Sequence, residues 1–180
     1  MSCAASGQAI GKSGRKMLMN RKYLPASLLM MTLLLFLMNI EAEAKEPVMA
    51  PRIEAPTLTG ETQVIPVKGK RTILHFWTTW CPSCKMELPA FEQIVKENQS
   101  DVDILTVNLL GAEQSKHAVA QFVKDRKFTF PIVLDEHGEM MKKYQIITIP
   151  TTFFINEKGE VVKNHVGPLT KKQIKEWTNS

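Results

Sequence analysis

The chain has 180 residues, with 23 Lys and Arg against 18 Asp and Glu, and a formal net charge of +5. Five of those basic residues but only two of the acidic ones lie before residue 45, so the rest of the chain carries a net charge of only +2. Such a small excess is no argument for a nucleic-acid-binding protein, and no nucleic-acid partner is expected. The remainder is long enough for one domain with its own core, which we expect to be a monomer.

The first 44 residues have the order of an export signal. A basic block between Lys12 and Lys22 precedes an uncharged apolar run from Leu24 to Ile40, and residues 42–44 (Ala-Glu-Ala) provide a small-residue cleavage site. Basic residues ahead of the run and acidic ones after it place the rest of the chain outside the membrane. The run is at the short end of what spans a bilayer. Residues 1–44 are therefore a cleaved signal or a membrane anchor, and the domain is expected at the extracytoplasmic face of the cell membrane or secreted.

The remaining residues alternate between strand-like and helix-like patterns. Residues 45–56 are rich in Pro and Glu, which predicts a linker, and residues 57–180 form the predicted domain. Its expected strands and hairpin are at 57–67, 72–77, 102–109, 130–134, 151–156 and 160–165, and its expected helices follow Cys84 and lie at 113–127, 139–144 and 171–177. Strands alternating with helices and ending in a hairpin predict an α/β fold, a mixed central sheet flanked by helices.

The chemistry of the sequence centres on its cysteines. Cys3 lies ahead of the apolar run, so the exported part keeps only Cys81 and Cys84, in a C-x-x-C. A strand that turns into a helix here places Cys81 at the helix N-terminus, where unpaired N–H groups and the helix dipole favour a thiolate. Pro82 suits the first helical position. Cys84, one turn deeper, can attack a mixed disulfide formed by Cys81, so the spacing supplies a nucleophile and a resolving thiol.

Other uses of the pair fit less well. A zinc site needs about four ligands and the sequence has no second C-x-x-C. Haem attachment needs a His after the second Cys, where the chain has Lys85. A structural disulfide across so short a loop would stabilise the fold little. Redox chemistry without a metal or other cofactor is therefore the prediction.

Residues 76–89 (FWTTWCPSCKMELP) resemble the active-site segment of the TlpA/ResA branch of thioredoxin-like proteins. Residues 149–153 (IPTTF) resemble the cis-proline loop of the same fold, and residues 112–135 resemble the helix-plus-strand insertion of this branch. The resemblance implies a thioredoxin fold with an N-terminal β-hairpin and a central insertion. It also implies a cis peptide bond between Ile149 and Pro150 beside Cys81, with both residues in the substrate groove. Trp80 is expected to touch substrates as well.

Two residues near the cysteines have specific expectations. Glu87 follows Cys84 by three residues, hence on the same helical face, and matches a glutamate that the family associates with proton handling; the alternative is a solvated surface glutamate. His75 is a departure, because thioredoxin itself has a buried acidic residue at this position. We expect a buried neutral imidazole, the alternative being a switchable charge near Cys84.

The resemblance favours a reductant of disulfides in exported client proteins. Members of the branch take electrons from a membrane thiol transporter and pass them to apocytochromes c awaiting haem or to envelope and spore assembly proteins. A thiol oxidase of exported proteins and a copper-binding chaperone on the same fold remain alternatives, although copper chaperones normally have C-x-x-x-C. A peroxidase is a more distant one, because Leu74 stands where the peroxiredoxin pattern has Pro.

Overall fold

The computed structural model describes residues 26–38, 46–97 and 102–179. The chain divides into two units, residues 1–45 and 46–180. In the first, Ala26–Met38 form helix α1, while the basic block, both ends of the apolar run and the predicted cleavage site lie outside the described residues. Within the described parts of the chain, no helix combines the length and apolar character needed to cross a membrane.

The second unit opens with a two-stranded hairpin. Strands β1 (Ile53–Pro56) and β2 (Thr62–Ile65) pair antiparallel, with Ile53 opposite Ile65. Side chains of β1 are alternately buried and exposed, as in a strand with one face on a core. Strand β1 therefore occupies residues that the sequence predicts to be linker.

A five-stranded sheet forms the centre of this unit. Its strands are β3 (Arg71–Trp77), β4 (Val102–Asn108), β5 (Ile132–Leu134), β6 (Thr151–Ile155) and β7 (Val161–Val166), in the order β5-β4-β3-β6-β7. Strands β3, β4 and β5 are parallel, and β6 and β7 run antiparallel to their neighbours. All residues of β3 after Arg71 are buried, which fits a central strand rich in β-branched and aromatic residues.

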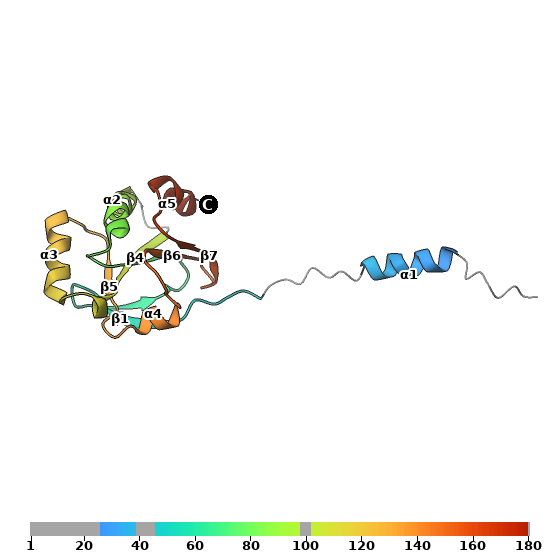
Figure 1. Ribbon diagram of the computed structural model, residues 1–180, viewed down its shortest axis with the longest axis horizontal. Helices are drawn as coiled ribbons and strands as arrows, with labels where there is room; N and C mark the ends of the chain where they lie inside the picture. The colour runs from blue at the N-terminus through green and yellow to red at the C-terminus, as the bar shows by residue number, and fades with distance from the viewer. Residues whose placement is uncertain (1–25, 39–45, 98–101, 180) are drawn as a thin grey trace, which may run out of the picture. The chain divides into compact units, whose positions relative to one another are not determined.

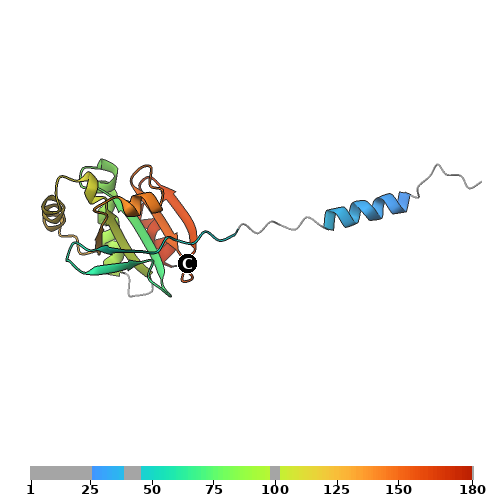
Figure 2. The ribbon, with the colours of Figure 1, turned by 90° about the horizontal axis from the view of Figure 1, so that it is seen from below.

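Helices cover both faces of the sheet (Figures 1 and 2). They are α2 (Pro82–Glu97), α3 (Lys116–Arg126), α4 (Glu139–Lys143) and α5 (Lys171–Thr178), with a 3₁₀ turn at Leu110–Ala112. Helix α3 begins later than predicted because Ser115 caps it, its side chain accepting a hydrogen bond from the Ala118 N–H. A capping box of Thr170 and Gln173 starts α5.

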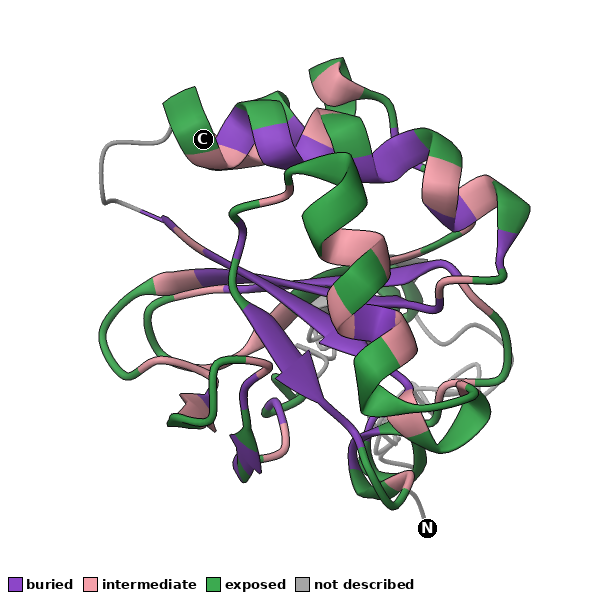
Figure 3. Ribbon diagram, turned by 90° about the vertical axis from the view of Figure 1, so that its left-hand side faces the viewer, coloured by how far each residue is buried: buried purple, intermediate pink, exposed green. Residues whose placement is uncertain are grey.

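The alternation of β3 side chains divides the interior into two cores. Ile73 and Trp77 pack with apolar residues of α2, α3 and α5. Leu74 and Phe76 pack on the other face with the hairpin and with Met140 of α4. Figure 3 shows the buried strands between the two layers. The predicted mixed sheet, flanking helices, N-terminal hairpin and central insertion (α3 with β5) are confirmed.

The segment before the hairpin and the loop inside it touch the two outer strands of the sheet. On one side, the Val161 N–H of β7 donates to the Val48 oxygen over 2.8 Å, and Met49 forms a β-bridge with Glu160. On the other side, Thr57 bridges Val133 of β5. Residues 48–57 are thus part of the folded unit.

Candidate redox site

The redox pair lies where β3 gives way to α2. Strand β3 ends at Trp77 and α2 begins at Pro82, the first helical residue as expected, so Cys81 immediately precedes the helix. Cys81 and Cys84 form a disulfide with Cα atoms 5.3 Å apart. Cys81 is 4% exposed and Cys84 is fully buried, so Cys81 is the one residue of the pair with any exposed surface.

Hydrogen-bond donors surround the sulfur of Cys81. The Cys84 N–H donates to Cys81 Sγ over 3.2 Å, and Ser83 Oγ lies 3.4 Å from the same sulfur. These groups belong to the first turn of α2, where backbone N–H groups lack intrahelical acceptors and the helix dipole is positive. Donors placed in this way are suited to stabilising a thiolate at this position.

Glu87 is buried rather than solvated, with 3% of its surface exposed. Its Oε2 accepts a hydrogen bond from the Leu169 N–H over 2.7 Å, joining α2 to the segment ahead of α5. Burial raises the pKa of Glu87 to about 7, and the Leu169 hydrogen bond partly opposes that rise. A carboxyl that titrates near neutral pH, one helical turn after Cys84, is suited to general acid–base work.

His75 is fully buried on the central strand β3. Its Nδ1 lies 2.9 Å from Thr152 Oγ1, its ring stacks on Phe91 with centroids 4.3 Å apart, and its Nε2 lies 3.3 Å from Glu87 Oε1. Burial lowers the pKa of His75 to about 3, so the contact with Glu87 is not an ion pair at neutral pH. The expected burial and hydrogen bonding of the imidazole are confirmed, and its lowered pKa agrees with a neutral ring.

The loop ahead of Cys81 is held by residues that the sequence did not indicate. The Glu113 carboxylate accepts hydrogen bonds from the Thr79 N–H and hydroxyl, and from Asn108 Nδ2 over 2.8 Å. The exposed Trp80 donates its indole N–H to the Ala112 oxygen over 2.9 Å. The start of the insertion therefore holds the two residues before Cys81, Thr79 and Trp80, in place. Only the position of Glu113 at the start of the insertion could have suggested this from the sequence.

The proline loop lies at the same end of the sheet, beside the C-terminal end of β3. The Ile149–Pro150 bond is cis, as predicted, and Ile149 packs against the core that contains Cys81. Because β6 runs antiparallel to β3, the start of β6 lies beside the end of β3. The structure thus brings five of the predicted residues to the end of β3 and the start of α2, with Glu87 buried one turn further along. A second cis bond, Ile65–Pro66, was not predicted.

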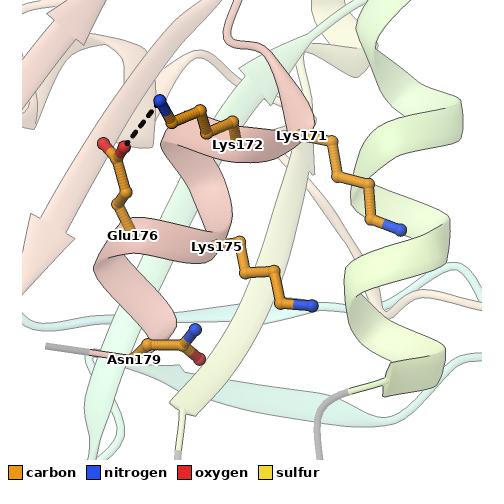
Figure 4. Close-up of a pocket in the computed structure, with 5 residues that line it drawn as sticks. All are labelled: Lys171, Lys172, Lys175, Glu176 and Asn179. Atoms are coloured by element: carbon orange, nitrogen blue, oxygen red, sulfur yellow. Dashed lines mark ion pairs between the residues drawn. The ribbon is translucent and has the colours of Figure 1, made fainter.

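Surface hollows on the described residues include the following two. One opens where β4 and β5 end, lined by Leu109, Gly111, Ala112, Asp135, Glu136, His137, Gly138 and Met141. It adjoins Trp80, whose indole binds the Ala112 oxygen. The other lies on α5 among lysines (Figure 4), but Lys172 pairs with Glu176 there and the neighbouring lysines pair with Glu97. The first hollow is the one beside the redox loop.

Comparison with known proteins agrees with this geometry. The AhpC/TSA family matches residues 48–164. Sporulation thiol–disulfide oxidoreductase A of Bacillus subtilis (strain 168) is 52% identical over 139 residues, which cover 77% of this chain and 84% of that protein. The thiol–disulfide oxidoreductase ResA of Bacillus thuringiensis subsp. konkukian (strain 97-27) is 35% identical over 130 residues, covering 71% and 73%.

A solved structure extends the likeness to three dimensions. The crystal structure of StoA from Bacillus subtilis matches with a TM-score of 0.68 and 51% sequence identity, over 73% of this chain and 99% of that one. The predicted thioredoxin fold is thereby confirmed, together with the predicted resemblance and activity class. The chain belongs to the AhpC/TSA family, and it is a thiol–disulfide oxidoreductase of the StoA/ResA type.

Proposed function

We propose that this oxidoreductase reduces disulfides in exported client proteins, with Cys81 as the attacking thiolate. The observation that carries the attacking role of Cys81 is the 3.2 Å hydrogen bond from the Cys84 N–H to Cys81 Sγ at the first turn of α2. The reducing direction is supported by the resemblance to the TlpA/ResA branch. A donor in that position stabilises the thiolate that attacks a client disulfide. Cys84 is fully buried and has access chiefly to Cys81, which suits a resolving thiol.

The reaction takes place in two exchanges. The Cys81 thiolate attacks one sulfur of the client disulfide, forming a mixed disulfide and releasing the other client sulfur as a thiolate. Cys84 then loses its proton and attacks Cys81 Sγ, forming the Cys81–Cys84 disulfide and releasing the second client thiolate. Two electrons pass from the pair to the client. Glu87, one turn from Cys84, accepts that proton as its carboxylate.

The proposed client-binding surface surrounds Cys81, at the end of the sheet where β3 stops. Trp80 is 57% exposed despite its size, which suits a contact residue. Ile149, which packs against the core that contains Cys81, and Pro150 belong to the proposed surface, and the hollow lined by Leu109, Ala112 and Met141 extends it beside Trp80. An extended client segment lying across these groups would present its disulfide to Cys81.

The relatives and the leader support a proposal for the client class and the cellular location. The relative that is 52% identical is named a sporulation oxidoreductase, which favours an envelope or spore assembly client over an apocytochrome c. Residues 1–44 act as signal or anchor and place the domain outside the cytoplasmic membrane, where a membrane thiol transporter re-reduces it. The domain works there as a monomer.

The test is the equilibrium reduction potential of the Cys81–Cys84 pair, measured in the full chain against glutathione or dithiothreitol at pH 7. A value at or below about −250 mV supports a reductant, while a value near about −120 mV makes the protein a thiol oxidase. Cys84→Ser, which cannot resolve the mixed disulfide, should retain clients covalently on Cys81. The double variant Cys81→Ser/Cys84→Ser is the matched control, and equal retention by both would contradict the assigned roles.

A further inference from the structure

The buried pair of His75 and Glu87 has a hydrogen-bond arrangement that the redox cycle described above does not explain. Nε2 of His75 and Oε1 of Glu87 lie 3.3 Å apart, in side chains that are 0% and 1% exposed. Among the described residues neither atom has another polar partner. The outer atoms of the pair do have partners, because Nδ1 faces Thr152 Oγ1 and Oε2 accepts from the Leu169 N–H.

The pair can satisfy its hydrogen bonds in both protonation states of Glu87. When Glu87 is protonated, its hydroxyl donates to Nε2, and the imidazole carries its proton on Nδ1 and donates to the Thr152 hydroxyl. When Glu87 is ionised, the imidazole carries its proton on Nε2 and donates to the carboxylate, and the Thr152 hydroxyl rotates to donate to Nδ1. A neutral imidazole has one donor and one acceptor nitrogen, and a hydroxyl can donate or accept, so both imidazole nitrogens have a suitable partner in either state.

We propose that His75 is a positioning residue whose change of neutral tautomer allows buried Glu87 to take a proton from Cys84 and to return it. The inference rests on the proposed function. As Cys84 attacks Cys81 Sγ, its S–H bond breaks, the proton goes to the Glu87 carboxylate, and the client thiolate leaves. When an external thiol reduces the Cys81–Cys84 disulfide again, the proton returns from Glu87 to Cys84. His75 gains and loses no net proton in either direction.

This role requires that no other charged group lies against the His75–Glu87 pair, where it could exchange a proton or form an ion pair with Glu87. Besides Glu87, helix α2 contributes Cys84, Lys85 and Glu92, and Cys81 immediately precedes the helix. The Glu92 carboxylate is bound to Thr129, Phe130 and Lys96. Strand β3 contributes Arg71, bound to the oxygens of Trp177 and Thr178. Strand β6 and the residues 167–169 have no titratable side chain, and Lys171 of α5 pairs with Glu97. Apart from the cysteines, these charged groups have partners of their own, and Lys85 is half-buried.

The first test is nuclear magnetic resonance of the oxidised full chain carrying ¹⁵N-labelled histidine and ¹³C-labelled glutamate, between pH 5 and 9. We expect His75 to remain neutral throughout and to move its proton from Nδ1 to Nε2 with the same midpoint as the carboxyl signal of Glu87. In Glu87→Gln this tautomer change should be lost. An imidazolium signal for His75, or one unchanging tautomer while Glu87 titrates, would overturn the proposal.

The second test is kinetic and uses His75→Leu, which gives Glu87 no partner at Oε1. The ionised carboxylate loses more than the neutral acid, because hydrogen bonds to charged groups are the stronger ones. The midpoint of the pH–rate profile for resolving a preformed mixed disulfide should therefore rise by about one pH unit. Leu74→Val perturbs the same strand from the opposite core and should keep the wild-type midpoint. An unshifted midpoint in His75→Leu would refute the positioning role.

The two tests separate this inference from the proposed function. The tautomer measurement needs no client and no electron donor, so it stands even if the reduction potential shows the protein to be an oxidase. Conversely, a strongly reducing pair with a fixed His75 tautomer would retain the proposed function and remove only the role of His75.

Discussion

Replacing Glu87 by Gln should stabilise the protein at neutral and alkaline pH while impairing its redox cycle. Glutamine has nearly the same shape and can still accept from the Leu169 N–H and donate to His75 Nε2. What it removes is the cost of burying a negative charge. Glu87 is 3% exposed, so that cost is not relieved by solvent. Catalytic sites often lower the stability of a protein in this way.

The magnitude follows from the pKa of Glu87. It rises from 4.5 in the unfolded chain to about 7 in the folded protein, and one pH unit of difference corresponds to about 1.4 kcal/mol. Because the folded pKa is raised, the stability that neutral Glu87 contributes is fully present below pH 4.5 and is lost as the pH rises to about 7. Glu87→Gln keeps that contribution, so its advantage over the wild type should grow from near zero at pH 4 to about 3 kcal/mol at pH 8.

The assay is urea unfolding of both proteins in the oxidised form at half-unit steps from pH 4 to 8. His75 affects the pH dependence of stability in the opposite direction. Because its folded pKa is lowered, the stability that the neutral imidazole contributes is lost as the pH falls from 6.5 toward about 3. To first order that effect is common to both proteins and cancels in their difference. If the difference in unfolding free energy between the two proteins were constant from pH 4 to 8, or if the variant were less stable than the wild type at pH 8, the raised pKa of Glu87 would be refuted.

Three further substitutions test other parts of the site. Glu113→Ala frees Thr79 and should lower the free energy of unfolding by about 2 kcal/mol in chemical denaturation; no loss would mean that those bonds do not hold the loop. Trp80→Ala should change stability by less than about 1 kcal/mol, yet lower kcat/KM for a protein disulfide several-fold more than for a small disulfide. Equal effects on both substrates would contradict its contact role. Leu88→Ala, in the core under α2, should cost about 3 kcal/mol in urea unfolding.

Much of the fold could be predicted because local patterns and tertiary packing agree. Strand 71–77 is rich in β-branched and aromatic residues and is buried after Arg71, and the C-x-x-C follows it at the point where a helix must begin. The sequence predicts a linker at residues 53–56, where the structure has strand β1, because Pro51 and Pro56 are typical of linkers. A strand such as β1, paired on one side only, tolerates Pro.

The site was only partly predictable, because its remaining contacts join residues far apart in the chain. The spacing from Cys84 identifies Glu87, but its burial depends on Leu169, 82 residues away. His75 meets Thr152 across two strands, 77 residues apart. Glu113 reaches Thr79 only because the insertion folds back on the redox loop. No sequence period marks such pairs, so they emerge only from the three-dimensional structure.

The contacts of residues 48–57 with the outer strands have a consequence for solubility. An open strand edge is a template on which another chain can add a strand, and natural sheets blunt their edges to prevent this. Here Val48 and Met49 pair with residues 160 and 161 at the start of β7, and Thr57 forms a β-bridge with Val133 of β5. A fragment cut at residue 57, where the sequence places the domain boundary, would lose the cover on β7 together with strand β1. Such a fragment should aggregate more readily than one that begins at residue 46, even with the redox site intact.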